Sequence, residues 1–122
     1  MNQDTNFEAG RRIGHIESFY RTSTEKSTRL LVMAEQGNYE SIYETTLSGN
    51  YGTLKEFMNE VELYKKEVQE KYKEYSNLRE KFPKLAYFNN KINIVKLELD
   101  HEIALSALEK AISILKKPIL KQ

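Results

Sequence analysis

The feature that most constrains the fold of this chain is a long run of helically spaced apolar residues between residues 54 and 82. Apolar side chains recur there every three or four positions over about four heptads, at Leu54, Phe57, Val61, Tyr64, Val68, Tyr72, Tyr75, Leu78 and Phe82. This spacing gathers them on one face of a helix, as in a coiled coil. Pro83 follows, and the residue before a proline disfavours the helical conformation. The pattern therefore predicts one helix over residues 54–82.

Residues 84–118 are predicted to form a second long helix, antiparallel to the first and ended by Pro118. They carry two apolar stripes. The first stripe is expected to pack against Val61 and Val68 in the core, and consists of Phe88, Ile92, Val95, Leu99, Ile103, Ala107 and Ala111. An alternative remains for residues 85–99, because Val95–Leu99 alternates with period two after a possible Asn89-Asn90 turn. These residues could then form a β-hairpin.

The second stripe of residues 84–118 leads us to expect a homodimer with two-fold symmetry, or a constitutive partner that covers the same stripe. One antiparallel helix covers only one stripe, and an exposed apolar stripe of this length is unusual on a soluble monomer. The predicted interface residues are Ile94, Leu97, His101, Leu108, Ile112 and Leu115.

The rest of the chain also follows a helical pattern. Ala9, Ile13, Ile16 and Tyr20 are spaced for a helix over residues 6–36, which Gly37 would end. Its polar segment 22–28, rich in Ser and Thr, could divide it into two helices, but no Gly or Pro interrupts it and we predict one. A disordered N-terminus at residues 1–5, a short helix at residues 39–47 and a tail at residues 119–122 complete the prediction.

These elements predict a single all-α domain over residues 1–122. A chain of 122 residues is long enough for one core, and its 5 Gly and 2 Pro are too few for a turn-rich β-sandwich or barrel. The expected architecture is a small antiparallel bundle of three to four helices. Its centre would be a long, coiled-coil-like hairpin formed by residues 54–82 and 84–118.

Composition excludes several chemistries. The chain contains no Cys, which rules out disulfides, Cys-ligated zinc, iron–sulfur clusters and thiol nucleophiles. No apolar segment approaches the length that spans a bilayer, and the N-terminus lacks the pattern of a secretory signal. We therefore expect a cytoplasmic protein.

One spacing could suggest a metal site. Glu98 and His101 form a Glu-x-x-His pair like those in di-iron helical bundles, but the second such pair that a di-iron site requires is missing. We expect no metal ion or other cofactor and no enzymatic activity.

Residues 37–53 are the predicted partner-binding segment, because they are acidic, rich in Tyr and free of Lys and Arg. Tyrosines near turns are typical of protein-binding surfaces. The candidate contact residues are Tyr39, Glu40, Tyr43, Glu44 and Tyr51.

We accordingly predict a small regulatory protein that binds a protein partner or itself, of the adaptor, chaperone, immunity or inhibitor type. Two alternatives remain. A nucleic-acid-binding regulator would use the basic residues of the first helix, Arg11, Arg12, Arg21, Lys26 and Arg29. A membrane-surface protein would use the Lys, Ile and Leu residues of segment 114–122. The nearly neutral net charge of +1 favours neither partner.

Overall fold

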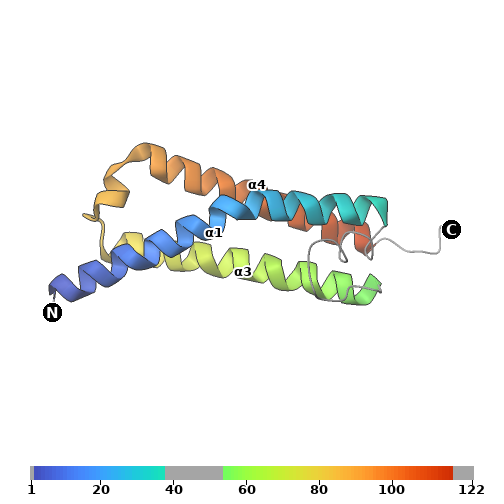
Figure 1. The fold of residues 1–122 in the computed structure, drawn as a ribbon, viewed down its shortest axis with the longest axis horizontal. Helices are drawn as coiled ribbons and strands as arrows, with labels where there is room; N and C mark the ends of the chain where they lie inside the picture. The colour runs from blue at the N-terminus through green and yellow to red at the C-terminus, as the bar shows by residue number, and fades with distance from the viewer. Residues whose placement is uncertain (1, 38–53, 117–122) are drawn as a thin grey trace.

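The computed structural model describes residues 2–37 and 54–116, which form an all-α bundle (Figure 1). Its elements are helix α1 (Asn2–Gln36), helix α3 (Leu54–Lys81), the 3₁₀ helix η1 (Ala86–Asn89) and helix α4 (Lys91–Leu115). Helices α1 and α4 run in the same direction, and α3 runs antiparallel to both. The described residues contain no β-strand. The all-α prediction is confirmed, and the alternative hairpin at residues 85–99 is wrong.

Helix α1 is one continuous helix, as predicted, and its polar segment does not divide it. It ends at Gly37, whose φ of 68° is a left-handed conformation that glycine adopts without strain. The Gly37 N–H donates to the Met33 carbonyl at 2.9 Å, which closes the last turn. Helix α1 begins at Asn2, so its first turn lies within the segment 1–5 that the sequence places before the first helix.

Helix α3 matches its prediction to within one residue. Its apolar face is buried as expected, with Val61 and Val68 fully inaccessible. The Phe82 N–H still donates to the Leu78 carbonyl at 2.8 Å, and Pro83 then ends the helical path.

The prediction of one continuous helix over residues 84–118 is wrong at its start. Helix α4 begins only at Lys91, and η1 lies in the connection that precedes it. Asn90 marks the boundary because its Oδ1 accepts the backbone N–H groups of Ile92 at 2.9 Å and Asn93 at 3.4 Å. Asparagine is among the best residues for this capping role. The predicted short helix at 39–47 and the tail at 119–122 lie outside the described residues.

The core is shared by all three helices, and α4 makes its most extensive contact with α1 rather than with α3. Both α1 and α4 have small buried side chains in this region, which allow two helix backbones to approach closely. On α1 these are Ser23 and Ser27, and on α4 they are Ala104, Ala107 and Ala111. The predicted hairpin of α3 and α4 is therefore only part of the core, and α1 supplies the larger share of the contacts made by α4.

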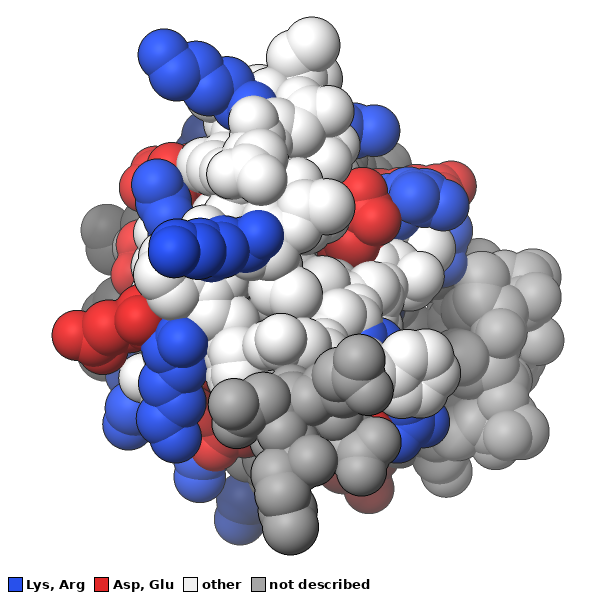
Figure 2. Space-filling model, turned by 90° about the vertical axis from the view of Figure 1, so that its left-hand side faces the viewer, with Lys and Arg blue, Asp and Glu red and all other residues white. Residues whose placement is uncertain are grey.

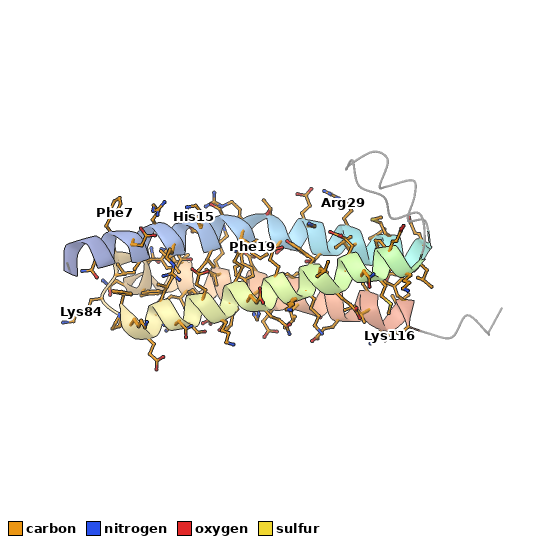
Figure 3. The ribbon with its side chains drawn as sticks, turned by 90° about the horizontal axis from the view of Figure 1, so that it is seen from below. Phe7, His15, Phe19, Arg29, Lys84 and Lys116 are labelled. Carbon is orange, nitrogen blue, oxygen red and sulfur yellow. The ribbon has the colours of Figure 1, made fainter. Side chains whose placement is uncertain are left out.

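Hydrogen bonds between α1 and α3 satisfy part of the polar surface that α1 brings into this core. The Tyr64 hydroxyl on α3 donates to Ser23 Oγ at 2.9 Å, and Ser23 Oγ donates to the Phe19 carbonyl at 2.7 Å. The Tyr20 hydroxyl donates to the Val68 carbonyl of α3. Figure 3 shows Phe19 between α1 and α3, where its ring contacts those of Tyr20 and Tyr64. Buried polar groups with partners lose little on leaving water, which accounts for the burial of Ser23. The hydroxyl of Ser27 is buried without a hydrogen-bond partner.

Candidate protein-binding surface

The two apolar stripes of α4 have the opposite roles from those predicted. The stripe expected at a subunit interface lies in the core of one chain: Leu97, Leu108 and Leu115 are buried, and Ile94, His101 and Ile112 are partly buried. The prediction that these six residues form an oligomer interface is therefore wrong. The residues that cover them include those of α1, whose polar segment packs closely instead of leaving a gap.

The stripe expected in the core is exposed at its four central residues, whereas Phe88, Ala107 and Ala111 are buried. Its members on the outer face of α4 are Ile92, with 74% of its surface exposed, Val95 with 62%, Leu99 with 55% and Ile103 with 39%. We call these four residues the α4 stripe. They follow one another at spacings of three, four and four, so they share one face of the helix. The prediction that Val95 and Leu99 are buried is wrong.

Helical geometry explains why Ala107 and Ala111 are buried although they seemed to continue the same stripe. Each step of four residues rotates about 40° past a full turn, so repeated steps of four drift around the helix. After Leu99 the steps to Ile103, Ala107 and Ala111 are all of this kind, and the last two residues reach the buried face. Farther along α4, the helix face that carries Ile92, Val95, Leu99 and Ile103 is occupied by Ser106 and Lys110, and both are exposed.

Charged residues border the α4 stripe on both sides. On a helical wheel, Lys91 and Glu102 lie along one edge of the stripe, and Lys96 and Asp100 lie along the other. None of these four takes part in the ion pairs found among the described residues, whereas Glu98 and Glu109 of α4 pair with Arg79 and Lys65 of α3. The stripe is thus an apolar surface with unpaired charges at its margins.

Other exposed apolar side chains on the described residues are scattered. Phe7 and Val32 are exposed on α1, and Leu63 is exposed on α3. Figure 3 shows Phe7 pointing away from the bundle. Isolated exposed apolar residues are ordinary on soluble proteins, so the α4 stripe is the surface that calls for an explanation.

The predicted partner-binding residues cannot be compared with this surface. Tyr39, Glu40, Tyr43, Glu44 and Tyr51 lie outside the described residues.

The Glu98–His101 pair takes part in packing contacts. The Glu98 carboxylate is 3.3 Å from Arg79 Nη1, and the His101 ring stacks on Tyr72. Burial lowers the pKa of His101, and the carboxylates of Glu102 and Glu98 act in the opposite direction. No group of three or more possible metal-ligating side chains occurs within residues 2–37 and 54–116. His15 lies exposed on α1 and points away from the bundle (Figure 3).

The basic residues of α1 are balanced by partners. Four arginines form ion pairs, namely Arg11 with Glu8, Arg12 with Glu74, Arg21 with Glu17 and Arg29 with Glu25. The Lys26 ammonium lies 4.2 Å from the centre of the Tyr64 ring. A nucleic-acid-binding face needs net positive charge, so this arrangement does not favour the nucleic-acid alternative.

A groove of about 410 Å³ lies at the end of the bundle where the α3–α4 connection meets α1. Its lining includes Gly10, Gly14, Leu85 and Tyr87. Figure 2 shows this end of the molecule, where uncharged surface is bordered by charged side chains of both signs. Burial raises the pKa of the Tyr87 hydroxyl to about 12.

Comparison with known proteins adds no relative. No family model, no curated protein and no solved structure matches this chain. Among the described helices, none combines the length and the apolar character needed to cross a bilayer.

Proposed function

We propose that this chain is a non-enzymatic protein-binding module that acts through the surface of its helical bundle, with the α4 stripe as the docking face. The observation that supports the proposal is the exposure of four branched apolar side chains on one face of α4. Water contact with such side chains is unfavourable by roughly 25 cal/mol per Å² of apolar surface, and a docked protein surface removes it.

The spacing of the stripe supports a helical partner surface. Apolar residues at i, i+3 and i+7 are how one helix contacts the groove or face of another. The exposed stripe gives α4 this pattern on its outer side, while its inner side is occupied by α1 and α3. The charged margins would then form the polar rim that borders most protein interfaces.

Site-specific photo-crosslinking in the native host tests this proposal. A photoreactive amino acid at Val95 is expected to give an adduct with a protein, and the same residue at Leu63 on α3 is the matched control. Both positions are exposed, so random collisions would label them equally. The Val95 adduct should disappear when Leu99→Glu is added and persist with Lys73→Glu on exposed α3 surface. Equal labelling at Val95 and Leu63, or no adduct at Val95, would contradict the proposal.

A further inference from the structure

We infer that the α4 stripe pairs with the same stripe of a second copy of this chain, with the two α4 helices antiparallel about a two-fold axis near residue 97. This inference rests on the proposed function and identifies its partner. It differs from the dimer expected from the sequence, because that interface is buried within one chain.

The apolar register is self-complementary. When two copies of a helix pair antiparallel about a two-fold axis, residues whose numbers have nearly the same sum lie opposite each other. A sum of 195 places Ile92 opposite the partner's Ile103. A sum of 194 places Val95 opposite the partner's Leu99. One position of the axis therefore covers all four residues of the α4 stripe.

The charges at the margins agree with the same axis. In this arrangement each edge of the stripe faces the same edge of the partner, with the chain direction reversed. Lys96 then lies opposite the partner's Asp100 on one edge, and Lys91 lies opposite the partner's Glu102 on the other. The residue numbers add up to 196 for the Lys96–Asp100 pair and to 193 for the Lys91–Glu102 pair. These sums differ by one or two from those of the apolar pairs, and long charged side chains can span an offset of that size along the helix. Opposite charges therefore meet on both edges, which favours this register.

A parallel pair of α4 helices would place like charges together. In a parallel pair each edge faces the opposite edge of the partner, and the flanking residues that meet are about five positions apart. Lys91 would then lie beside the partner's Lys96, and the two-fold axis would repeat this contact on the other side of the pair. Neither lysine takes part in an ion pair among residues 2–37 and 54–116, so nothing in that part of the chain would offset their repulsion. The charges thus select the antiparallel arrangement.

The length of the stripe sets the expected strength. From Ile92 to Ile103 it extends roughly 17 Å along the helix at 1.5 Å per residue. Stable specific interfaces are larger than a contact of this length provides, so the dimer should dissociate on dilution. We expect a dissociation constant between about 10 μM and about 1 mM.

Mixed cysteine cross-linking tests the arrangement, since the chain has no native Cys to interfere. Val95→Cys and Leu99→Cys variants carrying different tags are mixed and oxidised. The antiparallel register predicts that the mixed disulfide forms faster than either self-disulfide. A parallel pair would give self-disulfides of each variant first, and that result would overturn the inference. Leu63→Cys, at an exposed apolar residue of α3, is the control and should cross-link only slowly.

Charge reversal tests the register independently. Lys96→Glu and Asp100→Lys should each raise the dissociation constant of the dimer by about 3- to 10-fold, because each brings like charges together. The double variant restores opposite charges and should return it to within about 2-fold of the unmodified chain. Sedimentation measures these constants directly, and circular dichroism confirms that each variant is folded. A double variant weaker than both single variants would overturn the inference.

The oligomeric state separates this inference from the proposed function. A chain that sediments as a 14.3 kDa monomer up to about 1 mM would overturn self-pairing. The proposed function would still stand if the Val95 photo-adduct in the host contains a different protein and depends on Leu99. If the chain sediments as a monomer and no Leu99-dependent adduct forms at Val95, both proposals are overturned.

Discussion

The imidazole ring of His101 on α4 stacks on the phenol ring of Tyr72 on α3, with ring centres 4.1 Å apart and planes inclined by 19°. The edge of the Tyr20 ring from α1 closes the site, with centres 5.8 Å apart. One histidine therefore joins the three helices. Burial lowers the pKa of His101, although the carboxylates of Glu102 and Glu98 act to raise it. Folding therefore favours the neutral form of the ring.

This stacking predicts that the bundle loses stability in mild acid. The pKa of His101 in the folded chain is below the value of about 6.5 that it has when unfolded, so the unfolded chain binds the proton first. The stability that the neutral His101 ring contributes to the fold is fully present above pH 6.5. It is lost as the pH falls from there toward the pKa of His101 in the folded chain. Urea unfolding across this range measures it. His101→Phe should flatten the dependence on pH, and His15→Gln, at an exposed residue, should keep it. An unchanged slope in His101→Phe would contradict the prediction.

The two buried serines of α1 predict opposite effects of the same substitution. Ser23 accepts a hydrogen bond from the Tyr64 hydroxyl, whereas Ser27 Oγ is buried without a hydrogen-bond partner. Ser23→Ala removes that acceptor and should lower the free energy of unfolding by about 1–2 kcal/mol. Ser27→Ala removes an unsatisfied buried group and improves helix propensity, so it should leave stability unchanged or raise it by about 1 kcal/mol. Chemical unfolding compares the two, and a larger loss at Ser27 would show that its hydroxyl has a partner.

The opposite faces of α4 predict unequal costs for two leucine substitutions. Leu108 is fully buried and Leu99 is 55% exposed. Leu108→Ala should lower the free energy of unfolding by about 2–5 kcal/mol because it leaves a cavity. Leu99→Ala should lower it by less than about 1 kcal/mol when measured on dilute protein, where any dimer has dissociated. Equal losses would mean that the buried face of α4 has been assigned incorrectly.

The sequence predicts well those elements whose signals are local. Helix α3 has one apolar face at constant spacing and a proline at its end, so its position and its buried face follow from residues 54–83 alone. The end of α1 follows in the same way from Gly37. The start of α4 depends on Asn90, a residue type that is a strong N-cap. The prediction of one helix over residues 84–118 does not use this signal, and the Asn89-Asn90 turn enters only the alternative hairpin.

The buried face of α4 could not be predicted in the same way. Leu97 and Leu99 are the same residue type two positions apart, yet one is buried and the other exposed. Both faces of α4 are apolar, so periodicity does not choose between them. The choice depends on α1, where Ser23 and Ser27 allow a close approach that a count of apolar residues does not reveal. The α4 stripe was visible as a pattern, but its exposure follows only from this tertiary contact.

Two glycines inside α1 predict a gain in stability. An added methyl group at Gly10 or Gly14 would meet no atom within 4 Å, and both residues have ordinary helical φ angles. Alanine restricts the unfolded chain and favours the helix, so Gly14→Ala should raise the free energy of unfolding by about 0.5–1 kcal/mol. Gly37→Ala is the matched control and should lower it by about 1 kcal/mol, because φ is positive there. Thermal unfolding measures both. A destabilised Gly14→Ala would mean that the space beside α1 is occupied in solution.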